Sequence, residues 1–407
     1  MNIGVIAIFS LLLAVALIIP WRQGLMDKNR PFIIAVAAIA VAFSVRIFLF
    51  DFRSGDYNTF LVHWVDFFRQ NGGFAALKEP LGNYNLPYLY FLALFSYVEI
   101  NDLYLIKLLS LAFDIVLAFG MLKLTGLFTR SKVRLLAVYL ITLLLPTVVL
   151  NGARWAQCDS IYVSFAVLAL WAALSDKPIR SVVFIALSFA FKLQAVFLMP
   201  LWLVLIFAKK VRVWHLVFFP LTYFITTIPA LLAGRPLLDT LLLYYNQADT
   251  VGTALNYNSP SIFALLKPSG NSDAVSSYAI AIAFLFVLLI FTWTFLRRKN
   301  LNNESLVFIA LLFAIGIPFL LPHMHDRYFF MADVLTLLPA VLYAGYIPLA
   351  ALTSFASLLC YHSYFKLYKS SLPVSYGAIA LIGVLVILLI LTASHLGSRR
   401  FSQLKRR

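Results

Sequence analysis

Long apolar runs separated by short polar segments dominate the chain. A transmembrane helix needs about 20 largely apolar residues, and the runs that approach this length lie at 3–20, 31–50, 104–127, 135–151, 159–175, 213–233, 276–296, 304–322, 328–345, 347–366 and 374–395. The stretch 181–208 is apolar but contains Lys192. We expect it to form two short or broken helices that enter the membrane and return, which is possible where backbone lines a cavity. The pattern predicts about 13 spans.

The N-terminal run 3–20 has no basic residue before it, unlike the charged start of a secretory signal. We therefore expect residues 1–30 to hold an additional, uncleaved first span. No soluble domain and no internal repeat is evident, so the prediction is a single transmembrane domain over 1–407.

Lysine and arginine set the expected orientation. Six short segments contain 19 of the 32 basic residues, and these segments are 21–30, 129–134, 176–180, 209–212, 297–303 and 397–407. Such clustering is typical of cytoplasmic loops. With an odd number of spans, the N-terminus is expected outside and the C-terminus inside. The long loops 51–103 and 234–275 then face outward, and loops of this length are usually functional.

Composition supports a polytopic membrane protein. Of 407 residues, 63% are hydrophobic and only 12% are charged, which excludes a disordered chain, a soluble enzyme and a small disulfide-stapled module. Cys158 and Cys360 are too few for a disulfide framework. The net charge of +16 does not indicate a nucleic-acid partner, because the basic residues lie in clusters between apolar runs. We expect an all-α polytopic membrane protein.

The first outer loop carries an acidic residue near a predicted helix. From Thr59 to Phe68, apolar residues recur every three or four positions, which predicts an amphipathic helix at the membrane surface with Trp64 at the interface. Asp56 would lie near the start of this helix, after Gly55. Two interpretations of Asp56 remain open. It caps the helix, or it acts as a general base towards a hydroxyl.

A second predicted helix in this loop covers 87–98 and begins at Pro87, a residue favoured in the first helical turn. It must start and end outside, so we expect it to be re-entrant or interfacial. Tyr84 and Asn85 precede it and suit a sugar or a lipid headgroup. The alternative is an ordinary aromatic belt.

Two later segments place charges near the outer ends of spans. The short turn 151–160 contains Arg154, Gln157 and Asp159. An Arg154–Asp159 ion pair that holds the turn is the structural alternative to a functional role. Lys192 lies inside an apolar stretch, where a charge costs about 2.5 kcal/mol or more. We expect Lys192 to be functional or paired, and the alternative is that it extends to a membrane surface.

The segment Pro322–Tyr328 contains His323, His325, Asp326 and Arg327. Two histidines alone are a weak metal signal, and the neighbouring charges favour a hydrogen-bonded network. Arg327 is a planar, permanently charged donor that suits a phosphate, although a solvated charge cluster is also possible. Asp114 and Asp333 fall within spans, where we expect structural partners.

These charges together suggest a reaction. Lys192, His325 and Arg327 are cationic or can become so, and Asp56 is a candidate base on the same predicted side of the membrane. The combination suggests transfer of a group from a lipid phosphate to a hydroxyl.

Five segments resemble motifs of the GT-C class of integral-membrane glycosyltransferases, over roughly 31–396. The most similar members are bacterial relatives of glycosylphosphatidylinositol mannosyltransferases, and dolichyl-phosphate-glucose glucosyltransferases share the motif order. The resembling segments are Gly55-Asp56-Tyr57 with His63-Trp64, Asn83-Tyr84-Asn85-Leu86-Pro87, Trp155-Ala156-Gln157-Cys158-Asp159-Ser160, Phe191-Lys192-Leu193-Gln194 and His325-Asp326-Arg327. The second segment has one proline where the family has two, and Ala156 replaces a glycine.

The resemblance implies an inverting glycosyltransferase that uses a polyprenyl-phosphate sugar. Asp56 would be the catalytic base, and Arg327, His325 and Lys192 would bind the donor phosphate. The implied substrate-binding residues are Tyr57, His63, Trp64, Tyr84, Asn85, Trp155, Gln157, Asp159, Gln194 and Asp326.

The expected partners are a lipid-linked sugar donor, a glycan or glycolipid acceptor and membrane lipid. No metal or other cofactor is expected, although metal-dependent branches exist in the family. The expected location is the bacterial inner membrane, with the active site on the extracytoplasmic side. Two other functions fit less well. A flippase or transporter of lipid-linked oligosaccharides more often has internal repeats, and a polysaccharide polymerase or ligase would need more outer arginines.

Overall fold

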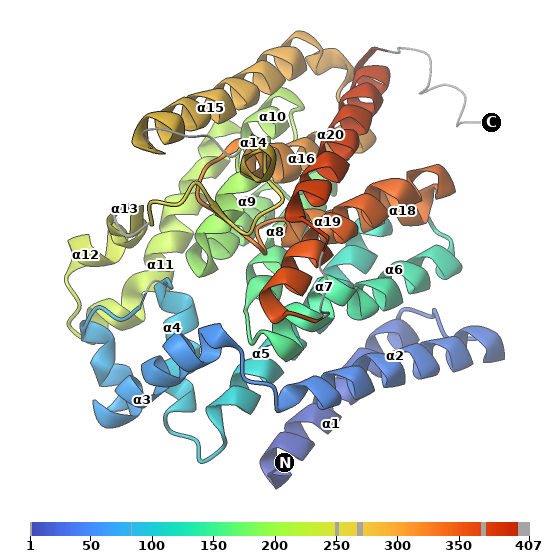
Figure 1. Cartoon of the computed structure of the whole chain (residues 1–407). Helices are drawn as coiled ribbons and strands as arrows, with labels where there is room; N and C mark the ends of the chain where they lie inside the picture. Colours follow the sequence, from blue (N-terminus) through green and yellow to red (C-terminus); the bar gives the residue numbers. More distant parts are fainter. Residues whose placement is uncertain (1, 83, 249–251, 267–271, 368–371, 398–407) are drawn as a thin grey trace. The chain divides into compact units, whose positions relative to one another are not determined.

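The computed structural model describes residues 2–82, 84–248, 252–266, 272–367 and 372–397, and Figure 1 shows their arrangement. The first half of the chain, to the break at Lys192, forms α1 Ile3–Arg22, α2 Asn29–Phe50, η1 Tyr57–Leu61, α3 Val62–Gln70, η2 Gly73–Lys78, α4 Leu86–Phe95, α5 Asp102–Thr125, α6 Lys132–Leu144, α7 Pro146–Val149, η3 Leu150–Arg154, α8 Asp159–Leu174 and α9 Pro178–Phe191. Most of the cytoplasmic tail predicted at 397–407, and Asn83 of the second motif, lie outside the described residues.

The second half is also helical, apart from two short strands. It forms η4 Leu193–Phe197, α10 Leu201–Phe207, η5 Val213–Val217, α11 Phe218–Leu232, α12 Leu237–Leu241, α13 Leu243–Ala248, β1 Asn256–Tyr257, α14 Phe263–Leu266, α15 Ser272–Leu296, η6 Arg298–Asn300, α16 Asn303–Leu320, β2 Met324–His325, α17 Phe330–Leu335, α18 Leu337–Leu342, η7 Ala344–Tyr346, α19 Ile347–Phe365 and α20 Val374–Gly397. The protein is therefore an all-α polytopic membrane protein in its architecture.

Eight helices within the described ranges are long and apolar enough to cross a membrane. A ninth candidate is the pair Lys132–Leu144 and Pro146–Arg154, which is bent by 43°. The bend lies at Pro146, because proline has no backbone N–H for the preceding helix. Other predicted spans appear as shorter or interrupted helices. The run 159–175 is α8, and 328–345 is divided into α17 and α18.

Two local features agree with the sequence pattern. The stretch 181–208 is broken at Lys192, between α9 and η4, as its charge predicted. The amphipathic helix predicted over 59–68 is present as η1 followed by α3. Trp64, however, is buried and not at an exposed interface, because its ring packs on Tyr84 with the centroids 5.6 Å apart.

The chain forms two compact units, each built from separate segments. Unit 1 contains Met1–Trp171, Ile179–Ala195 and Leu216–Thr250, and unit 2 contains Ala172–Pro178, Val196–His215 and Val251–Arg407.

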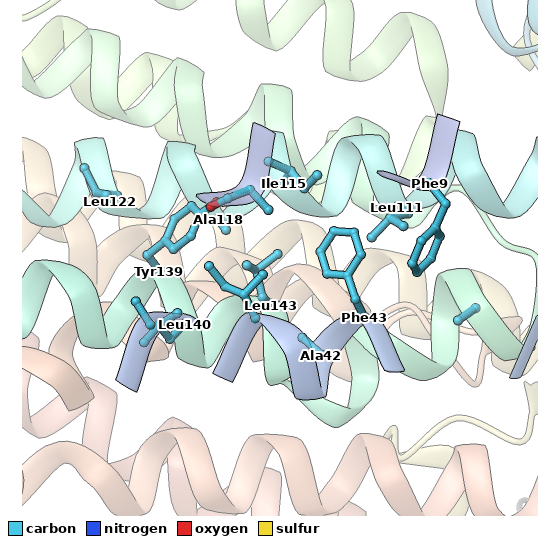
Figure 2. Close-up of a cluster of buried hydrophobic side chains, with 14 of the residues drawn as sticks. Phe9, Ala42, Phe43, Leu111, Ile115, Ala118, Leu122, Tyr139, Leu140 and Leu143 are labelled. Carbon is cyan, nitrogen blue, oxygen red and sulfur yellow. The ribbon is translucent and has the colours of Figure 1, made fainter. Parts of the chain in front are cut away.

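In unit 1, α5 is the most buried span and packs on α1 and α6, while α2 packs on α6 (Figure 1). Figure 2 shows the apolar contact between these helices, in which Phe9 of α1 meets Phe43 of α2 edge-to-face at 5.1 Å. A buried ion pair also joins α2 to α5. Arg46 Nη2 donates to Asp114 Oδ2 at 2.7 Å, and Ser160 Oγ donates to the other carboxylate oxygen of Asp114. Asp114 is thus the structural partner that its position in a span predicted.

In unit 2, α16 is surrounded by α10, α15, α17 and α20, and α19 packs along α20. Asp333 of α17 accepts a hydrogen bond from Ser357 of α19 at 3.0 Å, which agrees with the structural role expected for it. The strands β1 and β2 pair in parallel, with Tyr257 opposite His325. Two-residue strands are too short to produce a recognisable sequence pattern.

The positive-inside rule assigns the basic segments to the same side of the membrane. Within each unit, such segments contact one another at one end of the helices. In unit 1, Lys132 and Asp27 form an ion pair at 2.6 Å, which joins segments 129–134 and 21–30. In unit 2, Lys210 and Asp176 pair at 2.9 Å and join segments 209–212 and 176–180. Segment 297–303 lies at this end of unit 2 as well, because the Asn303 side chain donates to the backbone oxygen of Leu174 at 3.2 Å.

Candidate functional site

The Asp56 carboxylate is held by two neutral donors in unit 1. Its Oδ2 accepts one hydrogen bond from Trp155 Nε1 at 3.0 Å and another from Gln157 Nε2 at 2.7 Å. The side chain is half-buried, and it makes no capping bond to the backbone of the following helix. The capping interpretation is therefore wrong. The hydrogen bonds orient the carboxylate and leave it half-exposed beside a buried tryptophan.

Ser54 performs the capping that was considered for Asp56. Its Oγ accepts a hydrogen bond from the backbone N–H of Tyr57 at 3.1 Å, which satisfies a donor at the helix start. The same Oγ donates to the backbone oxygen of Trp155 at 2.6 Å. One hydroxyl thus fixes both the helix that carries Asp56 and the turn that carries its two donors.

The turn at 155–157 has an unusual backbone conformation. Ala156 has φ 61°, in the left-handed region that glycine adopts most easily. The conformation places the side chains of Trp155 and Gln157 on the same carboxylate.

Three hydrogen bonds hold Gln157 in place. Tyr84 donates its hydroxyl to Gln157 Oε1 at 2.7 Å, so Nε2 is the atom left to donate to Asp56. The Ser110 hydroxyl of α5 donates to the backbone oxygen of Gln157 at 2.6 Å. With only 3% of its surface exposed, Gln157 has little freedom to reorient.

Lys192 forms a buried ion pair next to this network. Its Nζ donates to Asp159 Oδ1, while Asn151 Nδ2 donates to Asp159 Oδ2 at 2.6 Å. The side chains of Lys192 and Asp159 are 9% and 3% exposed. Lys192 is therefore paired, which was one of its two expected states, and it does not extend to a membrane surface.

Tyr84 connects the ion pair to the base. Its ring centroid lies 5.4 Å from Lys192 Nζ, within the range of a cation–π contact, and its hydroxyl bonds Gln157. Asn85, the next residue, is buried and has a structural role. Its side chain caps α4 through the Leu86 N–H at 2.8 Å and donates to the Tyr223 hydroxyl at 3.3 Å.

The remaining predicted residues of unit 1 differ in exposure. His63 is exposed on α3, whereas Tyr57 is buried. Burial raises the pKa of the Tyr57 phenol above its ordinary value, so this group stays protonated near neutral pH. Gln194 is half-buried in η4, and its Oε1 is a buried acceptor that no described donor satisfies.

The third group of predicted residues, His325, Asp326 and Arg327, lies in unit 2. The His325 ring stacks on Tyr257 at 4.7 Å with an interplanar angle of 9°. Asp326 is buried and Arg327 is half-buried. His323 points its ring elsewhere, because its two ring nitrogens bond the Ser276 hydroxyl and the Ala254 backbone oxygen, each at 2.8 Å. A metal bound by both histidines is not supported, and no group of three or more potential ligands occurs among the described residues.

The site in unit 1 contains residues that the sequence did not single out. Ser54, Ser110 and Asn151 each bond to a motif residue or its backbone. Asn151 could have been found, since it precedes Asp159 in the same short turn. Ser54 could also have been found, because serine is a favoured residue at a helix start. Ser110 could not, because it lies within a long apolar run and donates to a backbone oxygen, which no residue pattern marks. No model of a known protein family matches the chain, and no curated protein matches it.

Proposed function

We propose that the chain is an inverting glycosyltransferase that moves one sugar, of the mannose or glucose class, from a polyprenyl-phosphate donor to a hydroxyl acceptor. The acceptor would be a cell-envelope glycan or glycolipid. The observation that carries this proposal is the Asp56 carboxylate, which two neutral donors orient while it remains half-exposed. A carboxylate held in this way is suited to accept a proton from a substrate hydroxyl.

In the proposed reaction, Asp56 accepts the proton of the acceptor hydroxyl while that oxygen attacks the anomeric carbon. The new bond joins the acceptor oxygen to the anomeric carbon, and the bond from that carbon to the phosphate oxygen breaks. The electron pair leaves with polyprenyl phosphate, so no protonated acid is required. Attack from the face opposite the phosphate inverts the anomeric configuration.

In unit 1, Lys192 would stabilise the leaving phosphate, since the hydrogen bonds of a cationic donor strengthen as charge develops on the leaving group. For His325 and Arg327 of unit 2, phosphate binding is a role that the motif resemblance implies. Lys192 can contribute while paired with Asp159, because an ammonium has three N–H donors. Neutral donors of unit 1 would act differently. Trp155 and Gln157 would position the Asp56 carboxylate, and Tyr84 would position Gln157.

Other residues would contact substrate, as the motif resemblance implies. In unit 1 these are Tyr57, His63, Trp64, Asp159 and Gln194, and in unit 2 the residue is Asp326, whereas the side chain of Asn85 is occupied by its structural contacts. Gln194 has support of its own, because its unsatisfied Oε1 can accept a hydrogen bond from a sugar hydroxyl.

The proposal includes a location and a topology. The protein would lie in the bacterial inner membrane with about 13 spans and with Asp56 on the extracytoplasmic side. The eight long apolar helices found within the described ranges are compatible with this number, provided that shorter and interrupted helices complete the rest.

The decisive experiment measures transfer of labelled mannose or glucose from a polyprenyl-phosphate donor by the purified protein. Asp56→Asn should reduce the rate by about 100-fold or more, the contribution of a general base, and the variant should retain the thermal stability of the wild type. Asp51→Asn is the matched control. Asp51 lies in the same loop, is exposed and accepts a hydrogen bond from the Tyr104 hydroxyl at 2.6 Å, so transfer should change less than twofold.

Two results would contradict the proposal. One is near-normal turnover by Asp56→Asn. The other is a product whose anomeric configuration, measured by NMR, is the same as that of the donor.

A further inference from the structure

Arg235 is a buried arginine with few partners, outside the candidate site. It is 7% exposed, and its one hydrogen bond among the described residues runs from Nη1 to the backbone oxygen of Glu79 at 3.4 Å. Its Nε is buried without an acceptor. A guanidinium has five N–H donors, and a buried charge of this kind is costly unless other groups satisfy it.

Nearby carboxylates do not supply this partner. Asp239 of α12 interacts electrostatically with Arg235. No carboxylate of the described residues, however, lies within ion-pair distance of the Arg235 guanidinium. Glu79 contributes its backbone oxygen, and its side chain is exposed. The Tyr90 hydroxyl of α4 is used elsewhere, because it donates to the backbone oxygen of Thr226 at 2.7 Å.

Arg235 lies three residues beyond the end of a candidate membrane span, Val213–Leu232. This span is formed by η5 and α11 together, and Arg235 follows it after Gly234, which has φ 100°. A side chain added at Gly234 would meet nothing within 4 Å, so there is open space beside the turn. Exposed leucines surround this turn, with Leu232 84% and Leu238 69% exposed. Exposed leucines beside a span are suited to contact acyl chains, and the end of a span lies at headgroup level.

We propose that Arg235 binds the phosphate group of an anionic membrane lipid. A guanidinium recognises phosphate through two parallel N–H donors, and the neighbouring leucines would hold the lipid chains. The Arg235 guanidinium makes no hydrogen bond to Asp56, Trp155 or Gln157. Tyr223 of α11 bonds Asn85, and Leu232 at the end of the same helix lies about 13 Å further along the helix axis. The proposal does not depend on the proposed transferase activity.

Native mass spectrometry of the purified full-length protein tests this proposal, with phosphatidylglycerol, diacylglycerol of the same chain length and inorganic phosphate as separate probes. The wild type should bind phosphatidylglycerol at least tenfold more tightly than diacylglycerol. Arg235→Gln should lose this difference, while Arg235→Lys should retain part of it. Lys78→Gln is the matched control, because it removes an exposed charge in the same loop as Glu79 and should change binding less than twofold.

Any of the following results would overturn the proposal. Equal affinity for phosphatidylglycerol and diacylglycerol would show that no phosphate is recognised. Equal loss in Arg235→Gln and Lys78→Gln would indicate general charge attraction. Binding of inorganic phosphate as tightly as the lipid would identify a soluble anion as the ligand. If Arg235→Gln does not fold, the rise in Tm that phosphatidylglycerol gives the wild type is compared with that of Arg235→Lys, and an equal rise would also contradict the proposal.

Discussion

The backbone at Ala156 gives a direct test of how the Asp56 donors are positioned. A non-glycine residue in the left-handed region costs about 1 kcal/mol, and Ala156 has φ 61°. Ala156→Gly should therefore raise the free energy of unfolding by up to about 1 kcal/mol, even though glycine gains entropy in the unfolded chain. Thermal unfolding in detergent measures the change. Ala153 is buried three residues earlier without a positive φ, so Ala153→Gly should lower stability, and a parallel drop in both variants would refute the strain argument.

Gln157 tests positioning without removing the base itself. Gln157→Leu deletes the 2.7 Å bond to Asp56 and leaves the bond from Trp155 Nε1 to the carboxylate in place. If the proposed reaction is correct, kcat should fall by up to about 100-fold, the loss expected when a catalytic group is displaced by about 1 Å, while KM changes less than threefold. Tyr84→Phe removes the hydroxyl that supports Gln157 while the bond from Gln157 to Asp56 can persist, so it should have a smaller effect on kcat. A large rise in KM with unchanged kcat would mean that Gln157 binds substrate instead.

At the scale of elements, Lys107 connects α5 to the end of α2 and to the start of the first loop. It is fully buried in α5, and its Nζ donates to the backbone oxygens of Leu49, Phe50 and Phe52 at 2.9, 2.8 and 2.7 Å. The last carbonyl groups of a helix have no partner within the helix, so one ammonium caps the end of α2 just before Ser54.

Lys107→Met should lower the free energy of unfolding by about 2 kcal/mol or more, because buried carbonyl groups lose their donor. Thermal unfolding in detergent measures this change. Lys123→Met on the same helix is the control, since Lys123 is half-buried over the Phe119 ring and should matter by less than about 1 kcal/mol. Equal Tm values for the two variants would show that the cap contributes nothing.

The same elements explain what could be predicted from the sequence. The helix over 59–68 and the break at Lys192 follow from local signals, namely apolar spacing and one charge in an apolar run. Lys107 carries the same signal as Lys192, yet its partners are backbone oxygens, which no residue pattern marks. The expected exposure of Trp64 was wrong because its ring packs on Tyr84, a contact between separate segments that the local pattern does not reveal. Local pattern predicted the elements, and tertiary contacts decided which faces are buried.

At the scale of the whole molecule, the basic segments test the predicted topology. Residues 21–30 and 129–134 meet in unit 1 through Lys132 and Asp27, and segments 176–180 and 209–212 meet in unit 2 through Lys210 and Asp176. Exposed ion pairs of this kind contribute little stability. Their meaning is topological, because segments that share an end of a bundle can share one face of the membrane. The positive-inside rule would assign the grouped segments of each unit to the cytoplasmic face.

Cysteine labelling can determine which face this is. Gln23→Cys lies in a basic segment and Gln70→Cys ends α3 in the first loop, and both positions are exposed. The native thiols, Cys158 and Cys360, are buried, so they should give little background. In intact bacterial spheroplasts, a membrane-impermeant maleimide should label position 70 and not position 23, and in inside-out vesicles the pattern should reverse. Labelling of both positions from one face would contradict the predicted orientation, and with it the placement of Asp56 on the extracytoplasmic side.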